Sequence, residues 1–319
     1  MKIVFLETDS LGSDVDLSGF ETLGDVIKYN KSEPAVNAER IKEADILVVN
    51  KIPMNEASLK DAADLKLICI TGTGTNIVDF PYINSRKIAV ANVKGYSTAS
   101  VAQHTFALFF YLYEKLYHYD TFVKSGGYVK SDIFSCFDEK FNELEGKTWG
   151  IIGLGDIGKR VANIAGAFGC NIIYYSTSGR NQNKDYKRVD FDTLLKDSDI
   201  ISIHAPLNSD TENLINEEAL GKMKSTAFLL NLGRGPIVDE TALYKALTKG
   251  WIAGAGLDVL RQEPMAADNP LLAVKDSRKL IITPHIAWAT VEARRRCVME
   301  VYENMTAFLR GEERNIVVK

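Results

Sequence analysis

Three short segments of the chain carry side chains whose types and spacing could do chemistry. Arg234 stands in the run NLGRG, Glu263 in DVLRQEP and His285 in TPHIAW. A guanidinium can hold a carboxylate through paired hydrogen bonds, and a histidine can donate or accept a proton. A carboxylate can hydrogen-bond that histidine and fix its tautomer. Together they supply what the reduction of a carbonyl group beside a carboxylate needs.

Each of these segments begins where a short apolar run ends. The runs at 227–231, 254–258 and 280–283 are typical of buried parallel strands. In an open parallel sheet, ligands bind in the crevice at the carboxyl ends of the strands. We therefore expect Arg234, Glu263 and His285 to lie along the same edge of one sheet.

A glycine-rich run precedes these segments. Gly153, Gly155 and Gly158 belong to GLGDIG, which follows the apolar run 149–152 and opens a helical pattern at 157–168. The first glycine permits a tight turn, the second lets the backbone approach a pyrophosphate, and the third lets helix and strand pack closely. The helix start, with the N–H groups of Asp156 and Ile157, attracts phosphate. This context predicts a dinucleotide site.

The strand after the fingerprint indicates which dinucleotide could bind. It ends in YYSTSGR, and Ser176 stands where an acid would hold the ribose 2′-hydroxyl of NAD. Nothing there repels a 2′-phosphate, and Ser176, Thr177 and Arg180 could bind one. In the other interpretation Arg180 is a solvated loop residue and NAD binds without the acid. NAD and NADP both stay open.

Apolar runs alternate with helical patterns along the whole chain, as in βαβ units with parallel sheets. We expect a doubly wound α/β Rossmann domain for the dinucleotide at 98–289, and a smaller, flavodoxin-like α/β substrate domain at 1–97 and 290–319. The expected strands are 3–6, 46–50, 67–71, 89–92, 149–152, 171–176, 200–204, 227–231, 254–258 and 280–283. The expected helices are 39–44, 55–63, 157–168, 191–196, 217–222, 240–249 and 291–309. The apolar segment 100–117 joins the domains, and the tail 291–309 returns to the first, which makes that domain discontinuous.

Composition excludes several classes of function. The 319 residues include 46% hydrophobic ones and carry a net charge of -4, without a long run of Lys or Arg, so no nucleic acid partner is expected. The four cysteines and four histidines are scattered, which predicts no metal site and reduced thiols. No run approaches the roughly 20 apolar residues of a membrane helix. The N-terminal segment enters a strand directly, so the cytoplasm is the expected location.

These motifs, in this order, resemble the D-isomer-specific 2-hydroxyacid dehydrogenase family. The likeness covers nearly the whole chain: GTG at 72–74, the fingerprint, NLGRGPIVDE at 231–240, Glu263-Pro264 and Pro284-His285. The runs TGTGTN and HIAWAT are most similar to the glycerate dehydrogenase or hydroxypyruvate reductase branch. Ser176 departs from the family, because many NAD-using relatives carry Asp there.

The resemblance implies a role for each candidate residue. Arg234 would hold the substrate carboxylate and polarise the carbonyl, His285 would donate a proton as hydride arrives, and Glu263 would orient His285. The implied substrate is a small 2-oxo acid such as hydroxypyruvate or glyoxylate. Further substrate contacts are expected at Asn50, Lys51, Gly72, Thr73, Gly74 and Trp288. Further cofactor contacts are expected at His204, Ala205, Pro206, Thr211, Asn231, Leu232, Gly233, Asp258 and Ala287.

Two alternatives share this fold, since fold does not fix function. One is a dinucleotide-sensing corepressor, against which the absence of a basic patch counts. The other is an enzyme for a phosphorylated acid, against which the lack of an extra basic cluster in the first domain counts. The resemblance also implies a homodimer through the aromatic-rich segment 106–119.

Overall fold

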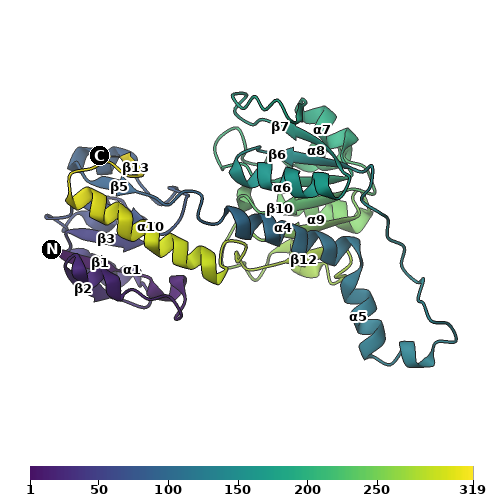
Figure 1. Cartoon of the computed structure of the whole chain (residues 1–319), viewed down its shortest axis with the longest axis horizontal. Coiled ribbons are helices and arrows are strands. Elements are labelled where there is room, and N and C mark those ends of the chain that lie inside the picture. The colour runs from purple at the N-terminus through teal and green to yellow at the C-terminus, as the bar shows by residue number, and fades with distance from the viewer. Residues whose placement is uncertain (319) are drawn as a thin grey trace. The chain divides into compact units, whose positions relative to one another are not determined.

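The computed structural model describes residues 1–318, apart from the side chains of Pro34, Ala35 and Val318. It divides the chain into two compact units, Met1–Ser97 with Ala289–Lys319, and Thr98–Trp288. Each unit has a largely parallel sheet covered by helices (Figure 1). The predicted α/β class is therefore confirmed.

The sheet of the first unit has the strand order β13-β5-β4-β3-β1-β2. All its neighbouring strands pair in parallel except β13, which runs antiparallel to β5. The strands are β1 (Lys2–Phe5), β2 (Asp25–Lys28), β3 (Ile46–Val49), β4 (Leu67–Ile70), β5 (Ala89–Ala91) and β13 (Ile316–Val318). The sequence pattern does not predict β2 and β13, because both lie at sheet edges where no buried apolar run is required.

Both faces of this sheet are covered by helices. Alternate residues such as Val4 and Leu47 pack with the helices α1 (Pro34–Ile41), α2 (Glu56–Leu59) and α3 (Phe80–Arg86). The long helix α10 (Val291–Leu309) lies across the sheet in Figure 1 and contacts β4. The observed bounds of α10 match the prediction. Helix α1 begins five residues before its predicted start at 39, with a proline in its first turn.

The sheet of the second unit is parallel throughout, with the order β12-β11-β10-β9-β6-β7-β8. Its strands are β6 (Thr148–Ile152), β7 (Asn171–Tyr175), β8 (Lys187–Arg188), β9 (Ile200–Ile203), β10 (Phe228–Asn231), β11 (Gly254–Leu257) and β12 (Leu280–Ile282). The strand order reverses between β6 and β9. That switch point is where doubly wound sheets bind ligands.

A separate hydrophobic core covers each face of this second sheet. Ile152 packs with α7 (Phe191–Asp197), α8 (Glu217–Lys222) and α9 (Glu240–Lys249). Its neighbour Ile151 points to the opposite face and packs with α4 (Thr98–Tyr113) and α6 (Asp156–Ala167). This alternation is the period of two expected for strands. Because all strands of this sheet run in the same direction, the loops that follow them emerge along one edge.

The segment that the sequence indicates as a connector is built into the second unit. It breaks at Lys115, which has a left-handed φ of 55°, into α4 and α5 (Leu116–Lys124). Phe109 and Leu112 of α4 are fully buried in this unit's own core. One face of α4 therefore packs within this unit, and the dimer expected through 106–119 remains a prediction for the exposed residues of that segment. An all-apolar helix signals burial without showing what covers it.

Within residues 1–318, no helix is both long and apolar enough to cross a membrane. The same residues contain no group of three or more His, Cys, Asp or Glu side chains placed to hold a metal ion.

Candidate active site

His285 and Glu263 meet at the ends of neighbouring strands of the second unit. His285 Nδ1 lies 2.7 Å from Glu263 Oε2, and Glu263 Oε1 accepts a hydrogen bond from the Leu260 N–H at 3.0 Å. An ionised carboxylate only accepts hydrogen bonds, so Nδ1 of His285 carries a proton. Both side chains stay about a quarter exposed, at 25% and 29%. Glu263 thus orients the ring and leaves Nε2 for a second partner.

The loop that carries His285 is held by Asp258, which is only 2% exposed. Its carboxylate accepts hydrogen bonds from the N–H groups of Ile286 and Ala287 at 2.9 Å, and from the Thr283 hydroxyl at 2.6 Å. The backbone of His285 has a left-handed φ of 54°, a conformation that costs a non-glycine residue about 1 kcal/mol or more. Asp258 thus compensates the unfavourable backbone on which His285 stands.

His104 of α4 extends this network, although the sequence pattern places it only within the joining segment. Its Nε2 lies 3.0 Å from Thr283 Oγ1. Because Thr283 donates its hydroxyl proton to Asp258, its oxygen accepts from His104, which fixes the proton on Nε2. Burial lowers the pKa of His104, and the charge of Asp258 opposes that shift. No sequence signal links positions 104 and 283.

Arg234 follows β10 on a turn that Asn231 holds. The Asn231 amide donates to the Arg234 carbonyl at 3.0 Å and accepts from the Gly233 N–H at 3.1 Å. A side chain at Gly235 would lie 1.9 Å from the Leu260 carbonyl carbon, so only glycine fits against the loop after β11. The Arg234 Nη1 donates to the Gly233 carbonyl at 2.8 Å. Among the described residues, no carboxylate pairs with this guanidinium, so most of its donors are open to a ligand.

The glycine fingerprint has the geometry of a phosphate site. A Cβ at Gly153, whose φ is 89°, would lie 2.8 Å from Ala205 Cα, and one at Gly158 would lie 2.3 Å from the Gly153 carbonyl oxygen. A Cβ at Gly155 would meet nothing within 4 Å. Gly153 and Gly158 therefore permit close packing, whereas Gly155 leaves open space beside the start of α6. The N–H groups of that first turn have no partner within the helix.

The segment after β9 lies beside this loop and holds an unusual histidine. Both ring nitrogens of His204 are buried, and neither has a partner among the described residues. Burial lowers the pKa of His204 to about 3, so the ring is neutral and one N–H lacks an acceptor. Buried donors without acceptors are rare, so this N–H is a candidate contact for a bound ligand. The Thr211 hydroxyl donates to the Pro206 carbonyl at 2.8 Å and fixes this segment. These residues fit a dinucleotide.

The turn after β7 includes the position at which an acid would bind the ribose of NAD. Ser176 is 5% exposed, and its hydroxyl accepts a hydrogen bond from the Asn181 N–H at 3.3 Å. Thr177 is half-buried and Arg180 is exposed. Positions 176–184 contain no Asp or Glu. The turn thus offers hydroxyl groups and a guanidinium where an acid would stand.

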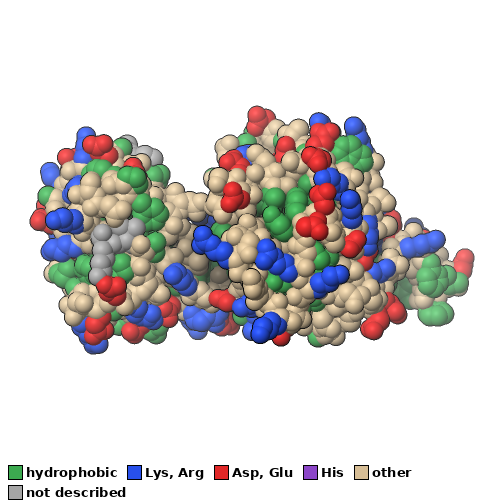
Figure 2. Space-filling view, turned by 90° about the horizontal axis from the view of Figure 1, so that it is seen from above, with side chains coloured by type: hydrophobic (Ala, Val, Ile, Leu, Met, Phe, Trp, Pro, Cys, Tyr) green, Lys and Arg blue, Asp and Glu red, His purple; other side chains and the backbone are tan. Residues whose placement is uncertain are grey.

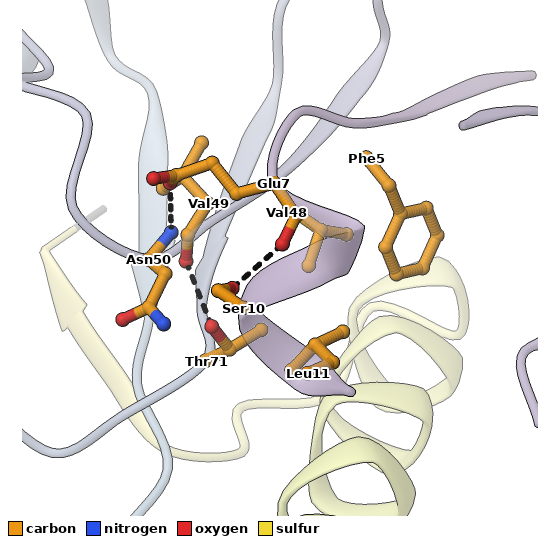
Figure 3. Close-up of a pocket in the computed structure, with 8 residues that line it drawn as sticks. All are labelled: Phe5, Glu7, Ser10, Leu11, Val48, Val49, Asn50 and Thr71. Carbon is orange, nitrogen blue, oxygen red and sulfur yellow. Dashed lines mark hydrogen bonds between the residues drawn. The ribbon is translucent and has the colours of Figure 1, made fainter. Parts of the chain in front are cut away.

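In the first unit, Glu7 anchors the segment after β3. Its Oε2 accepts hydrogen bonds from the backbone N–H groups of Asn50 and Lys51 at 2.8 and 2.9 Å. Figure 3 shows that the side-chain amide of Asn50 points away from Glu7. The adjoining cavity of about 10 Å³ has room for about one water molecule. The contact spans 43 residues of sequence, which is why the sequence pattern does not single out Glu7.

The glycine loop after β4 is held by hydrogen bonds between Thr73 and the segment after β5. The Thr73 hydroxyl donates to the Val93 carbonyl at 2.7 Å, and the Asn92 amide donates to the Thr73 carbonyl at 2.8 Å. The N–H groups of 72–74 donate to no acceptor among the described residues. Trp288, by contrast, packs partly buried against the core of the second unit.

The chain matches a known protein family. Residues 106–287 match the model described as "D-isomer specific 2-hydroxyacid dehydrogenase, NAD binding domain". The chain belongs to the D-isomer-specific 2-hydroxyacid dehydrogenase family. It is thus an oxidoreductase that acts on the CH–OH group of hydroxy acids with a nicotinamide dinucleotide.

Curated relatives match over the full length. The glycerate dehydrogenase of Methylorubrum extorquens is 38% identical over 99% of this chain and 98% of its own. The hydroxypyruvate reductase of Blautia hydrogenotrophica is 37% identical over 100% of both chains. These names agree with the branch that the motifs indicate.

Solved structures share the fold closely. The D-lactate dehydrogenase of Aquifex aeolicus, complexed with NAD and lactic acid, superposes with a TM-score of 0.88 at 30% identity, over 99% of each chain. An acyclic imino acid reductase in complex with NADPH and D-arginine gives a TM-score of 0.89 at 30% identity, over 100% of each chain. Neighbours of this fold therefore bind NAD or NADPH.

Proposed function

We propose that this protein reduces small 2-oxo acids, such as hydroxypyruvate or glyoxylate, to D-2-hydroxy acids with NADH or NADPH. The observation that carries the proposal is the 2.7 Å hydrogen bond between Glu263 and His285 at the strand ends of the dinucleotide-binding unit. The names of the relatives, glycerate dehydrogenase and hydroxypyruvate reductase, support this substrate class.

His285 is the proton donor in this proposal. A reduced nicotinamide held by this unit would supply the hydride that C2 of the substrate accepts. His285, in its protonated form, gives the Nε2 proton to the carbonyl oxygen, while its Nδ1–H stays on Glu263. The carboxylate stabilises the imidazolium and holds the ring so that Nε2 faces outward. In the oxidation direction the neutral ring accepts the hydroxyl proton at the same nitrogen.

Arg234 binds the substrate carboxylate in this proposal. Its planar fork matches the two oxygens, and its charge draws electron density from the adjacent carbonyl as negative charge develops on that oxygen. The Asn231 clamp holds the turn from which the side chain extends. Arg234 thus selects acids over other carbonyl compounds and orients C2.

The cofactor contacts follow the strand ends of the second unit. The N–H groups of Gly155, Asp156 and Ile157 would hold the pyrophosphate, and the His204 N–H would find its missing acceptor on the bound dinucleotide. The remaining proposed contacts are Ser176, Thr177, Arg180, Ala205, Pro206, Thr211, Asn231, Leu232, Gly233, Asp258 and Ala287.

The first unit supplies further substrate contacts in this proposal. The free N–H groups of 72–74 can receive carboxylate oxygens, because glycine permits close backbone approach. Asn50 and Lys51 add polar groups whose backbone Glu7 fixes. Trp288 of the second unit is a further proposed substrate contact.

Glu7 provides a specific test of this positioning. We expect Glu7→Ala to raise the KM for hydroxypyruvate about tenfold, because two N–H groups lose a charged acceptor worth about 1.5 to 3 kcal/mol and the Asn50 segment loosens. The kcat should change much less, since Glu7 holds no reacting group. Steady-state kinetics against the control Glu43→Ala, whose carboxylate pairs with Lys2 on the surface, measures this. An unchanged KM, or an equal change in the control, would contradict the role of Glu7.

The direct test of the reaction is a panel of 2-oxo acids. Purified protein should oxidise NADH or NADPH with hydroxypyruvate or glyoxylate, which the absorbance of the reduced nicotinamide follows. The product should be the D-isomer of glycerate from hydroxypyruvate. If folded protein that binds dinucleotide turns over none of the panel, the proposed function is wrong.

A homodimer is also part of the proposal, through a surface that includes the end of the segment 106–119 and extends to 141. Large apolar side chains of 116–141 stay exposed, most of all Val129 at 87% and Phe134 at 90%, and Figure 2 shows hydrophobic side chains gathered on a projection at one end. A surface of this kind marks an interaction site, and a second copy covers it symmetrically. Phe134→Ser with Val129→Ser should shift the sedimentation coefficient from dimer to monomer. A wild-type monomer would contradict the dimer.

A further inference from the structure

The turn after β7 lies beside two guanidinium groups that no carboxylate neutralises. Arg180 is on the turn itself. Arg188 comes from β8, and its Nη1 donates to the Gly179 carbonyl at 2.9 Å. Among the described residues, neither arginine forms an ion pair with an Asp or Glu. Two positive side chains that belong or bond to one turn, with no carboxylate between them, favour an anionic ligand there.

The edge strand β8 places Arg188 within reach of this turn. It pairs in parallel with β7, with Arg188 opposite Tyr174, so its side chain lies within one residue of the β7 terminus. Arg188 also lines an open groove of about 680 Å³, together with Tyr175, Lys187, Val189, Asp190 and Thr193. The guanidinium is therefore fixed by one hydrogen bond while its other donors remain accessible.

The carboxylate of Asp190, which lines the same groove, already accepts hydrogen bonds from another residue. The Asp190 carboxylate accepts from the Thr193 N–H at 2.9 Å and from the Thr193 hydroxyl at 2.7 Å, which caps the start of α7. These bonds lower the pKa of Asp190, with the side-chain bond to Thr193 contributing most. Asp190 thus serves the helix rather than Arg188.

Ser176 completes the set at the end of β7. Its oxygen accepts one hydrogen bond from the Asn181 N–H, and its own proton is donated to no described residue. An acid at this position would accept from both ribose hydroxyls and repel a 2′-phosphate. A hydroxyl donor at the start of a turn that carries Arg180 and is hydrogen-bonded by Arg188 has the opposite electrostatic preference, because phosphate oxygens accept hydrogen bonds.

We propose that Arg188, with Arg180 and Ser176, binds the 2′-phosphate of NADP(H), so that this protein uses NADPH in preference to NADH. Arg188 is the residue that the sequence does not point to, because it belongs to a separate edge strand and donates a hydrogen bond to the Gly179 carbonyl of the turn. The inference rests on the dinucleotide role of this unit, which the proposed function shares, but it requires no particular substrate. Arg188 is therefore a specificity-determining residue for the cofactor.

Binding of nucleotide fragments tests the inference without turnover. Isothermal titration should show that the wild-type protein binds adenosine 2′,5′-bisphosphate more tightly than adenosine 5′-monophosphate. Arg188→Ala should weaken the bisphosphate about 10- to 100-fold and leave the monophosphate unchanged, because only the 2′-phosphate loses charge-assisted hydrogen bonds. Arg188→Lys should retain part of the affinity, since a point charge lacks the planar fork.

Lys187→Ala is the matched control. Lys187 lines the same groove and carries the same charge, but it makes no hydrogen bond to the turn. It should weaken the bisphosphate much less than Arg188→Ala does. A wild-type protein that binds both fragments equally, an unchanged affinity in both Arg188 variants, or an equal loss in Lys187→Ala would overturn the inference.

Titrations with NADH and NADPH, run beside the panel of 2-oxo acids, separate this inference from the proposed function. If NADH binds as tightly as NADPH and 2-oxo acids are reduced, only the 2′-phosphate assignment fails. If NADPH binds and no 2-oxo acid is reduced, only the proposed reaction fails. Circular dichroism of each variant confirms that a lost affinity reflects the missing side chain in a folded protein.

Discussion

Replacing His285 by glutamine should slow the reduction of hydroxypyruvate at saturating substrate by at least about 10²-fold, the usual contribution of a general acid. Glutamine keeps a polar side chain of similar length but cannot deliver a proton from a charged ring. The dissociation constant of the dinucleotide should stay unchanged, because the glycine fingerprint and His204 lie on other strand ends. Stopped-flow reduction together with dinucleotide titration measures both quantities.

Glu263→Gln tests the hydrogen-bond partner of His285. It keeps an oxygen near His285 Nδ1 but removes the negative charge that favours the protonated ring. Its turnover rate in reduction should fall about tenfold, less than that of His285→Gln, because the ring keeps an oxygen partner but loses the charge-assisted hydrogen bond that orients it. A His285→Gln variant that turns over as fast as the wild type would remove His285 from the mechanism. A Glu263→Gln variant that turns over as fast as the wild type would remove Glu263.

Arg234→Ala should reduce kcat/KM for hydroxypyruvate by about 10²- to 10³-fold. Truncating one partner of a hydrogen-bonded charge pair costs about 2 to 5 kcal/mol, much of it from the unpaired carboxylate. Arg234→Lys should recover only part, because lysine keeps the charge without the fork. Most of the loss should appear in KM, with a further loss in kcat if the guanidinium also polarises the carbonyl.

A substrate lacking the carboxylate gives the control for Arg234. Hydroxyacetone carries a methyl group in place of the carboxylate of hydroxypyruvate, so Arg234 has nothing to bind. The wild-type protein should strongly prefer hydroxypyruvate, and Arg234→Ala should erase most of that preference. If the variant keeps the wild-type preference between the two compounds, Arg234 does not bind the carboxylate.

Much of the fold could be predicted from the sequence because buried parallel strands leave strong apolar runs. The predicted β6–α6 unit and the helix at 291–309 lie at or near their observed bounds. The strand β8 could not be predicted, because Lys187 and Arg188 are exposed on a sheet edge and carry no apolar signal. That short strand positions an arginine beside the ribose turn.

The site was predictable in its residue types and only in part in its connections. Strand-end placement brought Glu263 and His285 together, because parallel strands end along one edge. The supports behind them were not predictable. Glu7, His104 and the loop-holding role of Asp258 depend on contacts between residues far apart in sequence. A periodic pattern reports which face is buried, but it does not report which polar groups meet across the fold.

Transfer of a labelled hydride tests the central claim most directly. The wild-type protein would be given hydroxypyruvate and reduced nicotinamide dinucleotide carrying two deuterium atoms at C4, and the glycerate formed would be analysed by mass spectrometry and chiral chromatography. We predict D-glycerate with one deuterium at C2 in each molecule. Glycerate without deuterium at C2, or no glycerate from folded protein that binds the dinucleotide, would contradict hydride transfer to a 2-oxo acid.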